Sequence, residues 1–134
     1  MDFSFKKEER IHKRDDLTLL FEKGNSFLIH PFKVLYLESQ DSAARTNDPS
    51  FLKFGVSIPK RKFKRAVDRN LLKRRVKEAY RLNRNGLKTQ LKKQNKYVSF
   101  MVIYVDNSIL EFSVIEPKII LILQRLQAIY AENH

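Results

Sequence analysis

The chain has 134 residues, 43% of them hydrophobic, and its 27 Lys and Arg outnumber 15 Asp and Glu to give a formal net charge of +12. The absence of cysteine excludes disulfide bonds, thiolate-bound zinc and cysteine nucleophiles, and no apolar run approaches the roughly 18 residues that span a membrane. These properties predict a single folded domain over residues 1–134 in the cytoplasm, with a charged, flexible N-terminus over residues 1–9.

The first predicted element is a short helix over residues 13–23. Leu17, Leu20 and Phe21 recur at spacings of three and four, which places them on one side of such a helix. Gly24 follows as a residue that can end it. The pattern therefore predicts an amphipathic helix that stops at this glycine.

Two strands are predicted next, over residues 26–38 and 51–58. Both are rich in β-branched, aromatic and other apolar residues. The stretch between them, residues 39–50, contains Asp, Ser, Asn and Pro and reads as a loop. Pro59 ends the second strand because proline cannot donate a ladder hydrogen bond. We expect the two strands to pair as an antiparallel hairpin.

A cationic amphipathic helix is predicted over residues 65–84, ended by Asn85 and Gly86. At about 100° per residue, polar and apolar side chains separate onto two arcs. The polar arc holds Arg69, Asn70, Lys73, Arg74, Lys77, Arg81 and Arg84. The apolar arc holds Val67, Leu71, Leu72, Val76, Ala79 and Leu82.

The last two predicted elements are a strand over residues 97–105 and a helix over residues 113–129. The strand is nearly continuous in apolar residues, which favours a central place in the sheet. Ser113 and Glu116 have the spacing of a capping box at the start of the helix. This order predicts an α+β fold with helices mainly on one face of a small sheet, so that the other face can stay open for a ligand.

The positive charge is concentrated in residues 60–96. This segment holds 16 Lys and Arg against Asp68 and Glu78, a net charge of +14, whereas the rest of the chain nets −2. A cation recurs every fourth residue, about 6 Å apart along one side of the predicted helix, at Arg65, Arg69, Lys73, Lys77 and Arg81. A merely solvated surface is a poor alternative, because few carboxylates screen these like charges. The segment predicts a nucleic-acid-binding surface.

The loop before this helix, residues 60–65, has two interpretations that the sequence leaves open. In the first, its cations clamp phosphate groups around an accessible Phe63. In the second, Phe63 packs into the core and fixes the entry to the helix. The cations concerned are Lys60, Arg61, Lys62, Lys64 and Arg65.

Catalysis by this chain alone is not indicated. His12, His30 and His134 are scattered, without metal-ligand or triad spacing, and the three glycines lie too far apart for a phosphate-binding loop. Stacking of single-stranded bases on aromatic rings, best at Tyr36, competes with ordinary core packing of the same rings. We therefore expect neither a catalytic residue nor a metal site in the protein. The adjacent Asp15 and Asp16 could touch a magnesium ion near RNA, but an acidic first turn of a helix explains them more simply.

Three segments carry a resemblance to a known family. Residues 66–81, AVDRNLLKRRVKEAYR, follow a strand segment FGVSI at residues 54–58, and an earlier segment ends in GNSF at residues 24–27. Together they resemble the signature helix, the preceding strand and the amino-terminal turn of the bacterial ribonuclease P protein family. The resemblance extends from about Arg10 to the last helix, although Leu71 stands where the family has the second arginine of Arg-Asn-Arg.

The resemblance implies a fold and an activity. The fold would be a ribosomal-protein-like α+β sandwich with about three helices, a mainly antiparallel sheet of about four strands, and a left-handed βαβ crossover. The activity would be that of a ribonucleoprotein endonuclease that removes the 5′ leader of precursor tRNA. The catalytic RNA would perform the hydrolysis with bound Mg²⁺, and the protein alone would be inactive. Its partners would be this RNA and precursor tRNA, with neither a membrane nor DNA involved.

The cation pattern and the resemblance together predict two sites. The RNA subunit would contact Arg69, Asn70, Lys73, Arg74, Lys77 and Arg81 on the helix, and Lys60, Arg61, Lys62 and Arg65 before it. The single-stranded leader would lie in a cleft between the first helix and the sheet, lined by Leu17, Phe21, Tyr36 and Ser57.

Other functions predict different behaviour. A ribosomal or other structural RNA-binding protein would share the basic helix but take no part in cleavage. A duplex-DNA regulator would need a second helix placed for a helix-turn-helix, which the sequence does not offer. A free-standing nuclease would cleave RNA with magnesium alone.

Overall fold

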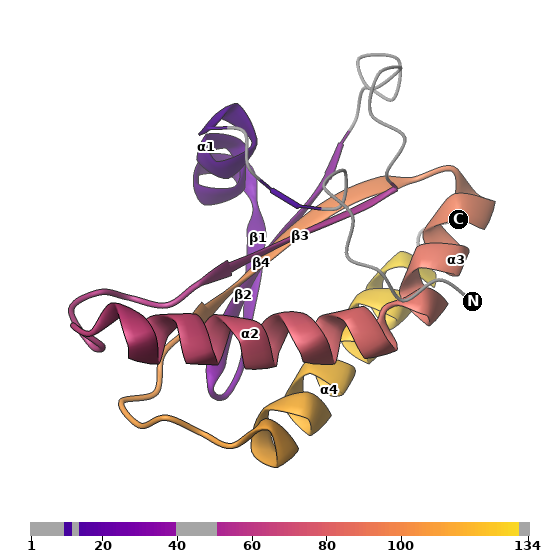
Figure 1. Cartoon of the computed structure of the whole chain (residues 1–134). Coiled ribbons are helices and arrows are strands. Elements are labelled where there is room, and N and C mark those ends of the chain that lie inside the picture. Colours follow the sequence, from indigo (N-terminus) through magenta and orange to yellow (C-terminus); the bar gives the residue numbers. More distant parts are fainter. Residues whose placement is uncertain (1–9, 12–13, 40–50, 132–134) are drawn as a thin grey trace.

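A computed structural model describes residues 10–11, 14–39 and 51–131, in which four helices and four strands are found (Figure 1). Their bounds are α1 Arg14–Lys23, β1 Asn25–Ile29, β2 Phe32–Ser39, β3 Leu52–Ser57, α2 Ala66–Asn83, α3 Asn85–Gln94, β4 Tyr97–Tyr104 and α4 Phe112–Ala131. The predicted N-terminus, residues 1–9, and residues 40–50 of the predicted loop lie outside the described residues.

The four strands form one mixed sheet in the order β1-β2-β4-β3. β1 pairs with β2 and β2 with β4 in antiparallel fashion, whereas β3 pairs with β4 in parallel. The predicted antiparallel hairpin between residues 26–38 and residues 51–58 is therefore wrong, because β4 lies between β2 and β3. The single strand predicted over residues 26–38 is in fact a hairpin, with Ile29 opposite Phe32. The prediction of a central β4 and of a mainly antiparallel sheet is confirmed.

Two of the predicted helix-end signals are wrong. Asn85 and Gly86 do not end the helical region but open α3, which was not predicted. α3 ends at Asn95, whose φ of 54° lies in the left-handed region that asparagine tolerates. α4 begins one residue before Ser113, so this serine is inside the helix rather than at its N-cap.

The helices cover the two faces of the sheet unequally. One face packs against α2, α3 and α4 in the main core, where the rings of Phe54 and Tyr80 stack at 4.1 Å between centroids and 8° between planes. On the other face Leu20 of α1 packs with Leu35 and Met101 in a smaller cluster. The expectation of helices mainly on one face is confirmed, and Figure 1 shows α1 apart from the other helices. The left-handed sense of the crossover from β3 to β4 stays a prediction.

The turn between α1 and β1 requires a glycine. The amide of Gly24 donates to the carbonyl oxygen of Leu20 at 3.0 Å, and a Cβ at this position would lie only 2.4 Å from the same oxygen. We expect Gly24→Ala to lower the free energy of unfolding by about 1–3 kcal/mol, since the backbone must shift to relieve the overlap. Urea unfolding followed by circular dichroism measures the change.

Gly86→Ala is the matched control for that substitution. Its Cβ would meet only the flexible amide end of Gln127, with Nε2 at 3.0 Å, and alanine is favoured over glycine within a helix by about 1 kcal/mol. We expect this variant to be as stable as the parent or slightly more stable. If Gly24→Ala unfolds at the same urea concentration as Gly86→Ala, the close approach at Gly24 has no energetic importance.

Candidate nucleic-acid interface

α2 buries one side and leaves most of its cations outward. Leu72, Val76, Ala79 and Tyr80 are fully buried against the sheet and α4. Two members of the predicted apolar arc are instead solvent-exposed, Val67 at 66% and Leu82 at 39%. The helix is thus rotated about its axis relative to the prediction, because Tyr80 rather than these residues completes the buried side.

The outward side of α2 presents several cations to solvent. Asn70, Arg74 and Lys77 are exposed and Lys73 is half-buried. Within the described part of the chain, Lys73, Arg74 and Lys77 have no carboxylate oxygen within 4.0 Å. Like charges this close on a helix repel one another, and an anion bound across them would offset that repulsion.

Two other arginines of α2 do have carboxylate partners. The guanidinium of Arg81 contacts Glu78 Oε1 at 2.6 Å through both Nε and Nη2. Arg75 donates from Nη1 to the carbonyl oxygen of Leu110 at 2.6 Å, and its Nη2 lies 3.8 Å from Glu111 Oε2. Arg75 therefore ties α2 to the segment before α4, whereas Arg81 is held as a neutral pair at the edge of the cationic side.

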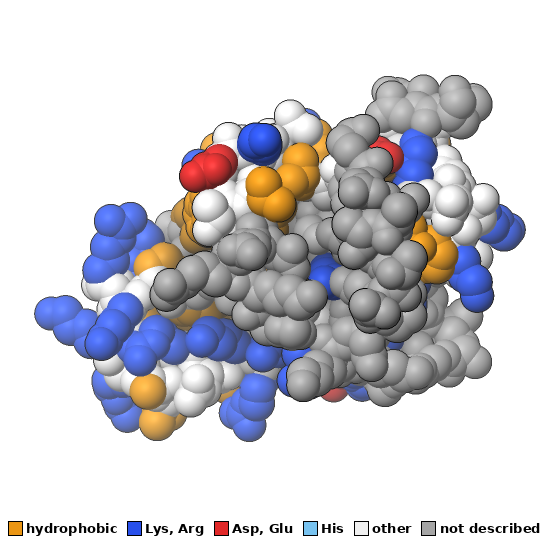
Figure 2. All heavy atoms as spheres, turned by 90° about the horizontal axis from the view of Figure 1, so that it is seen from above, with side chains coloured by type: hydrophobic (Ala, Val, Ile, Leu, Met, Phe, Trp, Pro, Cys, Tyr) orange, Lys and Arg blue, Asp and Glu red, His pale blue; other side chains and the backbone are white. Residues whose placement is uncertain are grey.

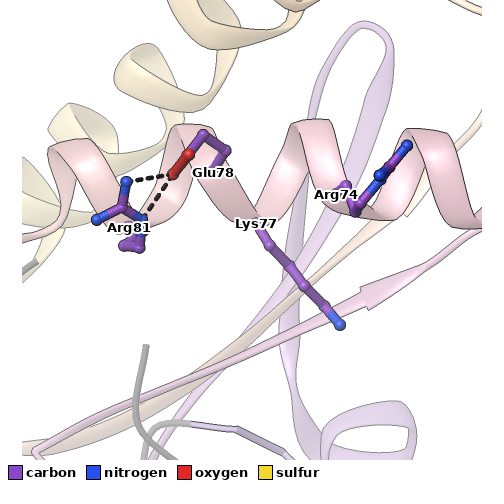
Figure 3. Close-up of a pocket in the computed structure, with 4 residues that line it drawn as sticks. All are labelled: Arg74, Lys77, Glu78 and Arg81. Carbon is purple, nitrogen blue, oxygen red and sulfur yellow. Dashed lines mark hydrogen bonds and ion pairs between the residues drawn. The ribbon is translucent and has the colours of Figure 1, made fainter. Parts of the chain in front are cut away.

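A hollow of about 270 Å³ lies along this side of α2, lined by Arg74, Lys77, Glu78 and Arg81. Figure 3 shows Arg81 turned toward Glu78 while Lys77 projects away from the helix on its own. Partial burial lowers the pKa of Lys77, and the positive charges of Arg10 and Lys73 lower it further. The neighbouring charges of Arg10 and Lys73 make the potential at Lys77 positive, which suits this hollow to a phosphate group.

The structure distinguishes the two interpretations of the loop before α2, residues 60–65. Phe63 is only 6% exposed, and its ring packs edge-on against Tyr104 with centroids 5.8 Å apart. Arg69 donates from Nη1 to the carbonyl oxygens of Phe63 and Lys64 at 2.7 and 2.9 Å, so it holds the loop against the helix. Phe63 is therefore a core residue, and Arg69 is a positioning residue as well as a candidate phosphate ligand.

The cations of this loop surround that anchored ring. Lys60, Arg61 and Arg65 are exposed, and Lys62 donates from Nζ to Asn107 Oδ1 at 2.8 Å. Figure 2 shows Lys and Arg side chains gathered at the end of the molecule where the loop and the start of α2 lie. The predicted RNA-contact residues that are exposed thus lie along the loop and the outward side of α2, at Lys60, Arg61, Arg65, Asn70, Arg74 and Lys77.

Arg84 does not belong to this surface. It is fully buried, its Nη1 donates to the carbonyl oxygen of Arg81 at 2.7 Å, and its guanidinium lies 5.7 Å from the centroid of the Tyr80 ring. Its assignment to the polar arc was wrong, because α2 ends at Asn83 and Arg84 joins it to α3 with its side chain buried. Leu71, in contrast, is half-buried, as expected for the apolar arc.

The predicted leader cleft is only partly assembled. Ser57 lies on the sheet face that α1 packs on, in a register row that joins Leu28, Lys33, Ile103 and Ser57 across the four strands. Leu17 packs at the edge of the cluster beneath α1, and Phe21 is 62% exposed. We name Leu28, Lys33, Ile103 and Ser57 the cross-strand row.

Tyr36 lies on the opposite face of the sheet. It is aligned with Phe100 and Phe54, and its ring packs against Phe27 at 5.6 Å and Tyr130 at 6.4 Å. It therefore does not share a surface with Ser57. Sequence reasoning missed Leu28 and Lys33, both exposed in the cross-strand row, because successive strand residues alternate between faces and both faces of β2 are apolar.

The polar cluster around Asp106 organises a turn. His30 Nε2 lies 3.0 Å from Asp106 Oδ2, while the amide and hydroxyl of Ser108 donate to Oδ1 at 2.7 and 2.6 Å. The hydrogen bonds from Ser108 lower the pKa of Asp106. Because histidine and serine both contact the carboxylate, the serine is not arranged as a nucleophile. Among the described residues no three acidic or histidine side chains converge on a metal position, and no described helix is long and apolar enough to cross a membrane.

Comparison with known proteins identifies the family. The family model described as Ribonuclease P matches residues 5–126. The ribonuclease P protein component of Porphyromonas gingivalis is 36% identical over 115 residues, covering 85% of this chain and 80% of the relative. That of Thermotoga maritima is 37% identical over 84 residues, covering 63% and 64%.

Solved structures show the same fold. A mutant of the Staphylococcus aureus RNase P protein, described as defective in mRNA degradation, superposes with a TM-score of 0.68 at 21% identity, covering 90% of both chains. The Thermotoga maritima RNase P protein gives a TM-score of 0.64 at 24% identity, covering 87% of this chain and 96% of the other. With the family match and the curated relatives, these findings show that the chain belongs to the ribonuclease P protein component family, whose members are subunits of an endoribonuclease complex with RNA.

Proposed function

We propose that this subunit binds the catalytic RNA of ribonuclease P through α2 and the loop before it, and thereby assists removal of the 5′ leader from precursor tRNA. The observation that carries the proposal is the outward side of α2, where Lys73, Arg74 and Lys77 lie together without a carboxylate partner among residues 10–11, 14–39 and 51–131. Because a single helix fixes their spacing, they present a rigid row of charge that a phosphate backbone can match.

The residues of this surface have complementary roles. Arg74 offers a planar fork that binds two phosphate oxygens at once, whereas Lys73 and Lys77 act as point charges. Asn70, exposed beside them, both donates and accepts and so suits a base edge or a ribose hydroxyl. Arg69 keeps the loop cations in place through its bonds to the carbonyls of residues 63 and 64. The hydrolysis itself belongs to the RNA and its bound Mg²⁺.

The single-stranded leader is assigned to the sheet face beside α1. Phe21 offers an exposed ring for stacking, and the cross-strand row places an exposed lysine beside exposed Leu28. Neighbouring strands are about 4.8 Å apart, so the row spans about 14 Å, the length of two or three nucleotides. Apolar contacts and stacking tolerate any base, which suits a leader whose sequence varies from one tRNA to another.

Reconstitution tests the proposed function. The chain is added to its RNA subunit at a magnesium concentration too low for the RNA alone, and cleavage of a precursor tRNA with a 5′ leader is followed. We expect cleavage to be restored, and binding to fall about a thousandfold between about 50 and 200 mM salt if about six phosphates are neutralised. A structural RNA-binding protein would give no such rescue, and cleavage by the protein with magnesium but no RNA would contradict the proposal.

A further inference from the structure

α3 carries lysines that lie outside the cationic surface formed by α2 and the loop before it. Between Glu78 and Asp106 the sequence contains no Asp or Glu, and four lysines fall in and just after α3, at Lys88, Lys92, Lys93 and Lys96. Figure 2 shows a second group of Lys and Arg side chains at the end of the molecule opposite the start of α2, where Figure 1 places α3. Arg84, which lies between the two groups in the sequence, is buried.

The other side of α3 fixes the direction of these lysines. Leu87 and Leu91 are fully buried, and α3 is further tied to α4 by side-chain amides. Gln90 Nε2 donates to the carbonyl oxygen of Gln127 at 3.0 Å, and Gln94 Nε2 donates to that of Tyr130 at 3.1 Å. Lys92 and Lys93 therefore project away from α4. Both are exposed, and neither has a carboxylate within 4.0 Å among the residues that the structure describes.

Helix stability alone does not account for this arrangement. Lysines in the last turn of a helix interact favourably with its dipole, which explains part of the placement of Lys92 and Lys93. Lys88, however, is the fourth residue of α3, near the end where the dipole favours anions, and the first turn contains no acidic residue. Positive charge thus runs along the whole helix, as expected for a surface that meets a polyanion.

We propose that Lys92 and Lys93, flanked by Lys88, form a second phosphate-binding surface. This surface binds a different segment of the RNA subunit from the one that binds to α2. The proposal rests on the proposed function and extends it to the opposite end of the molecule. α3 and α2 cover the same face of the sheet, whereas the leader surface is on the other face. The RNA subunit, rather than the leader, is therefore the polyanion that meets α3.

The test is the double variant Lys92→Gln/Lys93→Gln, which removes two charges but keeps helix-favouring side chains. Its affinity for the RNA subunit is measured from about 50 to 400 mM salt. We expect an affinity about tenfold lower at about 100 mM, and a log–log salt slope smaller by about 1.5, because two phosphates are no longer neutralised. The variant Lys92→Arg/Lys93→Arg, which keeps both charges, should have the affinity and the salt slope of the parent protein.

Lys23→Gln/Lys118→Gln is the matched control, with the same loss of charge on α1 and α4, and should leave the slope unchanged. Equal slopes for the α3 variant and this control would overturn the inference. So would a loss confined to leader-bearing precursor tRNA while RNA-subunit binding stays normal. This result differs from a failure of the proposed function. If the proposed function is wrong, substitutions on α2 will also leave binding to the RNA subunit unchanged.

Discussion

Replacing Lys73, Arg74 and Lys77 together with glutamate is expected to abolish binding to the RNA subunit, with an affinity loss of about a thousandfold or more. Each charge-assisted hydrogen bond to phosphate contributes about 1.5–3 kcal/mol, and reversal adds repulsion to that loss. The three side chains are exposed or half-buried and make no hydrogen bond or ion pair among the described residues, so the fold should persist. Filter binding at a fixed salt concentration measures the affinity, and circular dichroism checks the fold.

Only residues that make no contact holding the fold together are replaced in that experiment. Arg69 is left out because its guanidinium holds the carbonyls of Phe63 and Lys64, so its loss would disturb the loop as well as the charge. Lys23→Glu/Lys118→Glu/Arg125→Glu is the matched control, with the same change in net charge on other helices. If both triple variants weaken binding equally, total charge rather than the α2 surface determines affinity, and the assignment of the interface to α2 is wrong.

The elements that could be predicted from sequence are those with a strong local signal. α2 shows a cationic and an apolar side over 18 residues, and β4 is almost wholly apolar over 8. α3 was missed because Asn85 and Gly86 resemble a helix end, and what makes it helical is tertiary: Leu87 and Leu91 are buried, and two glutamines bond to the backbone of α4. The pairing of β3 with β4 rather than β2 likewise depends on contacts between distant segments, which no local pattern contains.

The candidate sites show the same division between local and long-range information. The cations of the interface could be found from their four-residue spacing, since that spacing alone places them on one side of a helix. The burial of Arg84 could not be predicted from the sequence, because α3 had not been predicted. Tyr36 was placed on the wrong face because Val34 and Tyr36 are no more apolar than Leu35 and Leu37, and a shift of one residue exchanges the faces of a strand.

The second large effect concerns the leader. The triple variant Phe21→Ala/Leu28→Ser/Lys33→Gln should lower the affinity of the reconstituted enzyme for precursor tRNA by about ten- to hundredfold, since stacking of one base on an aromatic ring contributes about 1–3 kcal/mol. All three side chains are exposed, so the loss should not reflect unfolding. Affinity for a tRNA without a leader should be unchanged, and the ratio of the two affinities is the measurement.

Tyr36→Phe is the control that separates the two faces of the sheet. Its ring packs against Phe27 and Tyr130 on the helix-covered face, so removing the hydroxyl should leave the leader-dependent ratio as in the parent. A lowered ratio for Tyr36→Phe with a normal ratio for the triple variant would place the leader on the other face and contradict the assignment to the cross-strand row. Because RNA-subunit binding through α2 is independent of either result, the two arms test the leader surface alone.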